Sequence, residues 1–402
     1  MNITKLETLR IRERPNLLWI QVYTNEGIVG LGETFFGAET VEAYIHEFVA
    51  PRVIGRDPLQ IDLLSSDLVG YLGFRSSGAE VRGNSAFDIA LWDIFGKVAN
   101  QPIAQLLGGF SRHEIRTYNT CAGADYIKKS SGQNSDNYDL GLKGVTAYDD
   151  LNGFLNCADE LAHSLLEDGI TAMKIWPFDL VAEKSRGQYI SQLDLETCLE
   201  PFKKIRKAVG NKIDIMVEFH SMWQLLPAIQ IARSLEPYET FWHEDPIKMD
   251  SLSSLKRYAE VSKAPICASE TLGSRWAFRD LFETNAAGVV MLDVSWCGGL
   301  SEARKIAAMA ETWHLPVAPH DCTGPVVLCA STHLSLNAPN ALVQESVRAF
   351  YKTWYRDLVT ALPEINNGMI TVPPGSGLGL ELHPDLDKKF NVSRRSTSKK
   401  NI

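Results

Sequence analysis

The chain has 402 residues, of which 45% are hydrophobic and 22% charged, and its formal net charge is −9. These proportions are those of an ordinary globular protein, and the acidic balance provides no basic surface for nucleic acid or an anionic membrane. No run approaches the roughly 18 apolar residues of a membrane span, and the first residues lack the apolar core of a signal peptide. The seven cysteines are odd in number and include no CxxC pair, which indicates reduced thiols in a cytoplasmic protein.

The N-terminal part of the chain reads as a separate α+β unit. Residues 1–35 show the pattern of a three-stranded meander, and helical patterns follow from about 38 to 107. We assign this unit to residues 1–112. Its loops 32–39 and 71–80 are placed to cap the mouth of the next domain, although plain connections would explain these loops equally well.

The rest of the chain alternates short apolar runs with helical patterns. Strict alternation of strand and helix demands parallel strands joined by right-handed crossovers. Repeated over residues 113–364, it predicts an α/β fold of the (β/α)8, or TIM-like, barrel type with an N-terminal α+β capping domain. The eight predicted strands lie near residues 116–120, 171–176, 213–218, 240–244, 265–270, 288–293, 315–320 and 341–345.

Four segments fall outside this alternation. Residues 122–150 and 180–192 are polar insertions after the first two strands, at the face of the barrel where insertions commonly shape a pocket. Residues 365–390 contain a short strand and a Gly/Pro loop, which we expect to return to the capping domain. Residues 391–402 are polar and basic, and we expect a disordered tail there.

Three glutamates end three successive predicted strands in near-identical settings. Glu218, Glu244 and Glu270 each close an apolar run and precede a polar turn, and both intervals are 26 residues, the length of one strand–helix unit. The carboxylates would therefore converge at the carboxyl end of the barrel. They would repel one another unless a cation lay between them, and all-oxygen ligation suits Mg²⁺. Any one of them alone would be interpreted as a surface glutamate.

Further polar residues stand at the ends of other predicted strands. Asp293, His320 and Glu345 follow Glu270 at successive intervals of 23, 27 and 25 residues, and Lys174 and Trp176 end the second predicted strand. Taken singly, Asp293 could be a helix cap, His320 a hydrogen-bonded strand-end histidine and Lys174 a solvated cation.

With these positions in place, the chain resembles the mandelate racemase type of the enolase superfamily over nearly all of its length. The resemblance implies a Mg²⁺ ion held by the three strand-end glutamates, which would bind a substrate carboxylate and stabilise the enediolate formed when its α-proton is removed. It also implies that Asp293 orients His320 as an acid/base pair and that Glu345 contacts the substrate carboxylate. By the same resemblance, we expect a homo-oligomer.

Two departures from the family pattern bear on function. Many relatives carry Lys-x-Lys at the end of the second barrel strand and use the second lysine as the base. Here Trp176 takes that place, and an indole cannot take up a proton, so we expect it to wall the substrate pocket. Lys174 remains, and could contact the substrate carboxylate or lower the pKa of a neighbour. Where many relatives have Asn two residues after the first metal ligand, this chain has His220, and residues i and i+2 of a strand share a face, here the barrel mouth.

A Glu-x-His at this strand end, with a non-basic residue replacing the second lysine, is similar to the galactonate and mannonate dehydratases of the superfamily. By that resemblance, His220 and His320 lie on different sides of the substrate. One abstracts the proton α to the carboxylate, and the other protonates the departing β-hydroxyl. We therefore expect a Mg²⁺-dependent lyase that dehydrates an aldonate or similar polyhydroxy acid to a 2-keto-3-deoxy acid. His220 could instead only hydrogen-bond a metal ligand.

Other functions stay open from the sequence. A racemase or epimerase of a 2-hydroxy acid would use the same two histidines, whereas a cycloisomerase is disfavoured because that branch usually keeps the paired lysines. A non-catalytic scaffold is disfavoured because all three glutamates and both histidines are present. The partner we expect is a small sugar acid, not a nucleic acid or a membrane.

Overall fold

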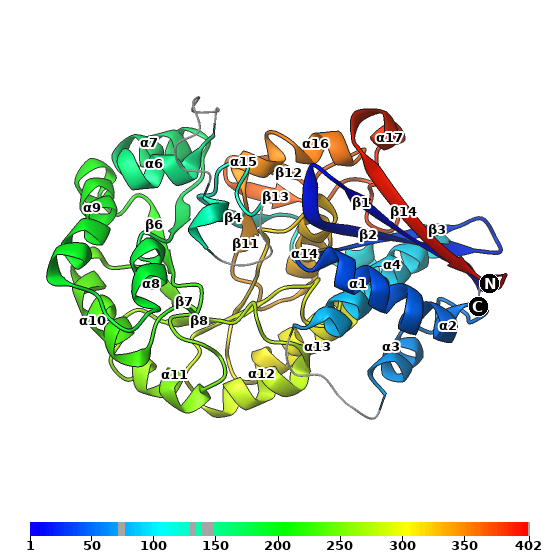
Figure 1. Ribbon diagram of the computed structural model, residues 1–402, viewed down its shortest axis with the longest axis horizontal. Helices are drawn as coiled ribbons and strands as arrows, with labels where there is room; N and C mark the ends of the chain where they lie inside the picture. Colours follow the sequence, from blue (N-terminus) through cyan, green and yellow to red (C-terminus); the bar gives the residue numbers. More distant parts are fainter. Residues whose placement is uncertain (71–76, 129–133, 139–147, 401–402) are drawn as a thin grey trace.

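The computed structural model describes residues 1–70, 77–128, 134–138 and 148–400. A ring of strands and helices forms the barrel, and a sheet with helices on one face forms the capping domain beside it (Figure 1). The predicted (β/α)8-type barrel with an N-terminal capping domain is confirmed. None of the described helices is long and apolar enough to cross a membrane. All seven cysteines are free thiols, as predicted.

The capping domain is built on an antiparallel sheet in the order β14-β1-β2-β3. Helix α4 lies directly on β3 because two glycines leave room for its backbone. A Cβ on Gly30 would come within 2.1 Å of the Ala90 carbonyl oxygen, and one on Gly32 within 1.9 Å of that of Ala86. The elements of this domain are β1 (Ile3–Ile11), β2 (Arg14–Thr24), β3 (Val29–Phe35), α1 (Ala38–Tyr44), a π-helix (Ile45–Val49), α2 (Ala50–Val53), α3 (Ile61–Val69), α4 (Ala79–Ala99), α5 (Ile103–Leu106), α17 (Leu386–Lys389) and β14 (Val392–Ser398).

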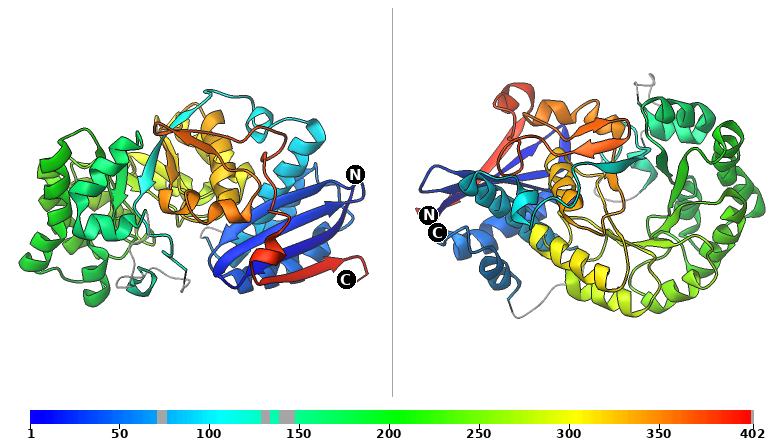
Figure 2. Two further views of the ribbon diagram at one scale, coloured as in Figure 1. Left: turned by 90° about the horizontal axis from the view of Figure 1, so that it is seen from above. Right: turned by 180° about the vertical axis from the view of Figure 1, so that it is seen from behind.

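The prediction of a disordered tail at 391–402 is wrong for most of that segment. Strand β14 pairs with β1 along its whole length, from Ile11 opposite Val392 to Lys5 opposite Ser398, and lies at the edge of the sheet (Figure 2). Its side chains are mostly exposed, so this edge strand needs no apolar face. The polar, basic composition therefore did not predict this strand, because backbone hydrogen bonds and not apolar side chains hold it in the sheet.

A buried histidine, His46, between β1 and β14 should make the stability of the fold depend on pH. His46 is buried, with Nε2 2.8 Å from Oγ1 of Thr8 on β1 and Nδ1 2.8 Å from Oγ1 of Thr397 on β14. Burial, and then the charge of Arg395, lower its pKa from 6.5 to about 4. As the pH falls, the unfolded chain binds this proton before the folded protein does, so the stabilisation is complete above pH 6.5 and is lost towards pH 4.

We expect the wild type to lose up to about 3 kcal/mol more of its free energy of unfolding between these pH values than a His46→Gln variant does. Urea denaturation at both pH values measures the difference. Equal losses in the two proteins would show that His46 is not held neutral in the folded state.

The barrel strands are parallel and follow the chain in order. Neighbouring strands pair from β4 to β10, and β11 pairs with β4. The ring closes between β10 and the residues just before β11. Val317 of β10 forms a β-bridge with Ala341, and the Val317 carbonyl accepts the Leu342 N–H at 2.8 Å. In the described part of the chain all eight predicted strands are present: β4 (Ile115–Thr120), β5 (Ala172–Ile175), β6 (Asp214–Glu218), β7 (Trp242–Glu244), β8 (Ile266–Ala268), β9 (Val289–Leu292), β10 (Val317–Pro319) and β11 (Gln344–Ser346).

Helices cover the outside of the barrel, as the alternation of strands and helices predicts, but α8, α14, α15 and α16 were not expected. The predicted polar insertion 180–192 contains most of α8, and α14 lies between β10 and β11. The helices of this domain are α6 (Asp150–Asn156), α7 (Ala158–Glu167), α8 (Asp179–Ser185), α9 (Gln192–Val209), α10 (Leu225–Leu235), α11 (Leu252–Ala259), α12 (Ser274–Glu283), α13 (Leu300–Thr312), α14 (Pro325–Asn337), α15 (Arg348–Tyr351) and α16 (Tyr355–Leu358).

Helix α14 shows no helical periodicity in sequence because nearly all of it is buried between the barrel and the capping domain. Its first turn is fastened to the capping sheet. The Glu33 carboxylate on β3 accepts the backbone N–H groups of Val326 at 3.1 Å and Val327 at 2.9 Å, and also the Trp19 indole N–H at 2.6 Å. A carboxylate at a helix N-terminus satisfies otherwise unpaired N–H groups and favours the helix dipole.

The segment predicted to return to the capping domain does so only in its later part. Residues 364–371 form the hairpin β12 (Glu364–Asn366) and β13 (Met369–Thr371), and β13 pairs with β4 of the barrel. The chain returns to the capping domain at Gly377 and Leu378. The Gly377 carbonyl accepts the Ile103 N–H at 3.1 Å, and the Leu378 N–H donates to the Asp93 carboxylate at 2.9 Å.

Candidate active site

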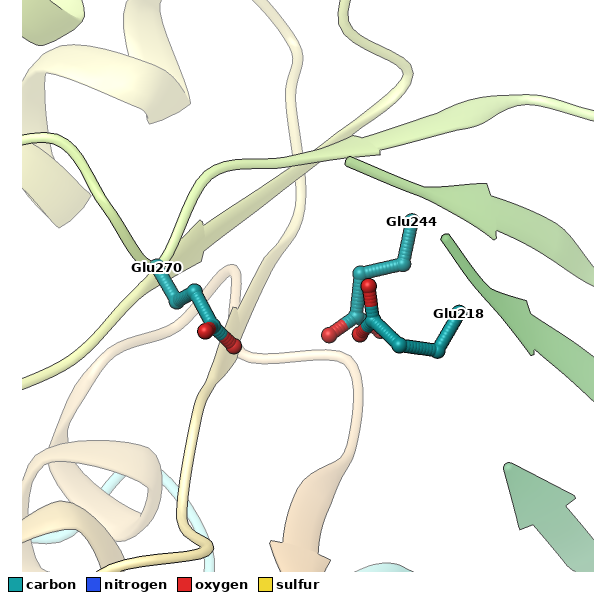
Figure 3. Close-up of side chains that lie close together, drawn as sticks. All are labelled: Glu218, Glu244 and Glu270. Carbon is teal, nitrogen blue, oxygen red and sulfur yellow. The ribbon is translucent and has the colours of Figure 1, made fainter. Parts of the chain in front are cut away.

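The three predicted glutamates come together at the carboxyl ends of β6, β7 and β8. Glu218 and Glu244 end neighbouring strands in register, and Glu270 follows β8 and faces them from the other side (Figure 3). One carboxylate oxygen of each glutamate can be chosen so that all three oxygens lie within 4.8 Å of one another. The Oε2 atom of Glu218 is buried and accepts no hydrogen bond among the described residues, although Nζ of Lys174 lies 3.4 Å away, so this oxygen remains able to bind a cation. Three carboxylates of this geometry fit a hard divalent ion such as Mg²⁺.

Lys174 is ion-paired with these glutamates. Its Nζ lies 2.6 Å from Oε1 of Glu244, 3.4 Å from Oε2 of Glu218 and 3.0 Å from Oε1 of Glu345. Burial by itself lowers the pKa of Lys174, but the charges of these carboxylates outweigh it and raise the pKa well above 10.5. Lys174 is therefore a permanent cation that offsets part of the negative charge of the cluster, not a solvated surface lysine.

Glu345 is fully buried behind Lys174. Its Oε1 accepts the Thr120 hydroxyl, and its Oε2 accepts the Asp321 N–H at 2.8 Å. Burial raises its pKa, but the charge of Lys174, followed by that of His320 and by these hydrogen bonds, brings the pKa down to about 2. Because both oxygens already bind protein groups, the contact of Glu345 with a substrate carboxylate stays a prediction.

Asp293 and His320 form a hydrogen-bonded pair, as the sequence suggested. Nδ1 of His320 lies 2.7 Å from Oδ2 of Asp293, whose Oδ1 accepts the Ser295 N–H at 2.6 Å and its hydroxyl at 2.7 Å. Nε2 of His320 lies 3.0 Å from Oε2 of Glu270. Burial lowers the pKa of His320, but the charges of Glu270, Glu345 and Asp293 raise it well above 6.5.

His220 reaches the same site, but not by strand alternation. Strand β6 ends at Glu218, and His220 has a φ of 47°, so it lies in a left-handed turn beyond the strand. Its backbone N–H donates to Oε1 of Glu218 at 2.6 Å, and its Nδ1 lies 2.7 Å from Oδ2 of Asp179. Burial lowers its pKa, but the charges of Asp179, Glu218 and Glu270 raise the pKa to about 9.

Both imidazoles open onto one cavity with a largely aromatic wall. The capping loop 32–39 contributes Phe36, and the insertion 122–150 contributes Tyr126 and Ile127, so both loops help to shape the pocket. Of the loop 71–80, residues 71–76 lie outside the described residues. The ring of Trp176 stands edge-to-face with that of His220, with centroids 5.6 Å apart. The cavity is lined by Phe36, Thr120, Tyr126, Ile127, Lys174, Trp176, His220, Glu270, Trp296, His320 and Cys322.

Sequence reasoning missed several residues of this site. Asp179 belongs to the first turn of α8, three residues after Trp176, and a carboxylate so close to a strand end was a usable signal. Trp296 follows Asp293 by three residues, and its ring centroid is 5.2 Å from that of His320. Phe36 and Tyr126 gave no such signal, because their place at the cavity depends on how the capping domain and the insertion fold over the barrel.

Comparisons with known proteins agree with this architecture. Residues 156–386 match the family described as enolase C-terminal domain-like, and residues 8–108 match the mandelate racemase/muconate lactonizing enzyme N-terminal domain. A D-galactonate dehydratase from Ralstonia nicotianae is 29% identical over 98% of this chain and 94% of its own. A D-xylonate dehydratase from Haloferax volcanii is 29% identical over 96% of this chain and 87% of its own.

Solved structures are similar over the whole chain. A mandelate racemase subgroup enolase from Agrobacterium tumefaciens, crystallised with a succinimide residue, sodium and phosphate, is 76% identical with a TM-score of 0.90, and the match covers 100% of both chains. An enolase protein from Sargasso Sea environmental sequencing is 44% identical with a TM-score of 0.88, and the match covers 99% of both chains. The names of the curated relatives agree with the prediction of an enzyme of the hydro-lyase class. The chain belongs to the enolase superfamily, in its mandelate racemase and muconate lactonizing enzyme family.

Proposed function

We propose that the protein is a Mg²⁺-dependent dehydratase that removes water from an acid sugar, such as an aldonate, to give a 2-keto-3-deoxy acid. One observation carries the proposal: two imidazoles, His220 and His320, line one cavity beside three convergent glutamates. Elimination of water needs one group to remove a proton and another to protonate the leaving hydroxyl. The dehydratase names of the curated relatives support this reaction over others that a histidine pair could catalyse.

Glu218, Glu244 and Glu270 would hold the ion. When bound, Mg²⁺ supplies positive charge that stabilises the negative charge developing on the substrate carboxylate during proton removal. Lys174 would add a second fixed cation beneath the same site, since its Nζ stays charged among the glutamates. Glu345 would hold Lys174 in place, in addition to the substrate contact that the family resemblance implies.

The proton transfers fall to the histidines. Nε2 of one imidazole accepts the proton from the carbon α to the carboxylate, and the electrons of that C–H bond form a C=C bond to the β-carbon. Nε2 of the other imidazole donates a proton to the β-hydroxyl, whose C–O bond breaks as water leaves. The resulting enol takes up a proton at the β-carbon and loses the proton of its hydroxyl, which gives the 2-keto acid.

The aromatic wall would separate this chemistry from bulk water. Trp176 lines the cavity and has no group that accepts a proton, so it cannot replace the lysine base of many relatives. Its place against His220 restricts the imidazole and presents an apolar face to the carbon chain of the substrate.

A screen tests the proposal. The purified protein with Mg²⁺ is incubated with a library of mono- and diacid sugars, and 2-keto acid is detected with a carbonyl reagent. We expect one or a few configurations to give product. If no member gives product but some exchange their α-proton in heavy water, the protein is a racemase or epimerase that uses the same two histidines. Without product or exchange from any member, the proposal fails.

A further inference from the structure

We propose that Asp179 is a positioning residue for His220, so that the cavity holds two Asp–His pairs of the same geometry instead of one. The proposal rests on the proposed function for its catalytic meaning, although its geometry stands independently. Neither the sequence patterns nor the family resemblance pointed to Asp179.

The first support is the hydrogen bond itself. Oδ2 of Asp179 lies 2.7 Å from Nδ1 of His220, and the Tyr138 hydroxyl donates to the same oxygen at 2.8 Å. Asp179 is only 2% exposed. A carboxylate can only accept, so the shared hydrogen must lie on Nδ1 of His220. When the ring is neutral, its lone pair therefore lies on Nε2, the nitrogen that remains for the substrate.

The second support is the likeness to the pair on the other histidine. Asp293 also accepts from Nδ1 of its partner His320, at the same distance of 2.7 Å. Both imidazoles line the same cavity, and they come from different elements: β10 ends just before His320, whereas His220 lies in the turn after β6. A base and an acid that act on one substrate both need their Nε2 aimed at it, and a carboxylate at each Nδ1 achieves this.

The third support is that the His220 backbone needs an external restraint. His220 and Ser221 both have left-handed φ angles, 47° and 56°, so no strand ladder directs the imidazole into the cavity. Helix α8 supplies the restraint, because it begins at Asp179 directly after the turn that follows β5. The ring of Trp176, nearly perpendicular to the imidazole, confines it from a second side.

A purely structural role is the competing explanation, because an aspartate in the first turn of a helix favours the helix dipole. The two explanations differ in what happens to His220. A structural role predicts that the loss of the Asp179 carboxylate leaves the His220 ring hydrogen and its catalysis unchanged in the folded protein. A positioning role predicts that both change while Mg²⁺ binding persists.

The experiment is proton NMR of the Mg²⁺-loaded protein, combined with kinetics. We expect two strongly downfield imidazole Hδ1 resonances, one for each Asp–His pair, assigned with His220→Asn and His320→Asn. Asp179→Ala should remove the His220 resonance, keep that of His320, and lower kcat by about 100-fold with KM within about threefold. Asp179→Glu should restore part of both the resonance and kcat.

Two further variants complete the design. Glu196→Gln removes a carboxylate of α9 at an exposed position and should leave both resonances and kcat unchanged. If Asp179→Ala does not fold, Tyr138→Phe removes one of the hydrogen bonds that fix the same carboxylate oxygen, and should move the His220 resonance and lower kcat by about threefold. The proposal is overturned if the His220 resonance and kcat persist in Asp179→Ala, or if the position of the resonance and kcat are both unchanged in Tyr138→Phe where that variant replaces it. If the resonances behave as expected but no acid sugar turns over in the wild type, the proposed function fails and the Asp179–His220 pair stands.

Discussion

Replacing His320 with asparagine is expected to lower the turnover of the acid sugar by about 10³-fold or more while Mg²⁺ binding stays within about threefold. Asparagine keeps a polar group beside Asp293 but cannot exchange a proton near neutral pH. The three glutamates remain in place, and the loss is therefore confined to proton transfer. Turnover is measured as 2-keto acid formation, and Mg²⁺ affinity by titration calorimetry.

The matched control is His163→Asn, at an exposed position of α7, which should turn over like the wild type. The α-proton exchange of the variants then separates the two roles. If His320→Asn still exchanges the α-proton in heavy water, His320 is the acid and His220 the base; if it does not, the roles are reversed. Undiminished dehydration by His320→Asn would refute the mechanism.

Replacing Glu244 with glutamine should weaken Mg²⁺ binding by about 100-fold or more and abolish activity at low Mg²⁺. Glutamine contributes a neutral, weaker oxygen to a site that depends on three carboxylates. In addition, Glu244 is the nearest ion-pair partner of Lys174, at 2.6 Å. Without the Glu244 carboxylate, the positive charge of Lys174 is less well balanced and repels the Mg²⁺ ion. Calorimetric titration with Mg²⁺ measures the change.

Glu345→Gln separates these two causes. It also removes a carboxylate from Lys174, at 3.0 Å, but Glu345 is not one of the three convergent glutamates. We expect its Mg²⁺ affinity to fall by less than about tenfold. If Glu345→Gln weakens Mg²⁺ as strongly as Glu244→Gln does, the charge of Lys174 governs affinity and the assignment of Glu244 as a ligand loses its support.

The parts of the site that repeat along the chain were predictable. Glu218, Glu244 and Glu270 could be found because a barrel places every strand end on one face, so an equal spacing in sequence becomes convergence in space. The same spacing placed Asp293 and His320 at the ends of successive strands, and the family resemblance paired them. The register of β6 with β7 confirms that equal spacing becomes convergence, since Glu218 pairs with Glu244.

Features that depend on the surroundings of a segment were not predictable. His220 was placed at the barrel mouth by strand alternation, yet the strand ends before it and a left-handed turn carries it there. Helix α14 has no polar face because the capping domain covers the side that solvent would otherwise meet. Strand β14 was mistaken for a disordered tail since an edge strand can be polar on both faces. In each case the deciding partner lies far away in the sequence.

The bond between Glu33 and the first turn of α14 bears on how a substrate enters. Phe36, which walls the cavity, follows Glu33 by three residues, and α14 packs between the barrel and the capping domain. Next to Glu33, the Thr34 hydroxyl donates to the Ser295 carbonyl at 3.1 Å, and the Trp296 indole donates to the Phe35 carbonyl at 3.2 Å. A hinge rotation of the whole capping domain would break all of these bonds and uncover a helix that has no solvent-facing side. Access therefore has to come from side chains and short loops at the rim, with the capping sheet serving as a fixed frame against which they move.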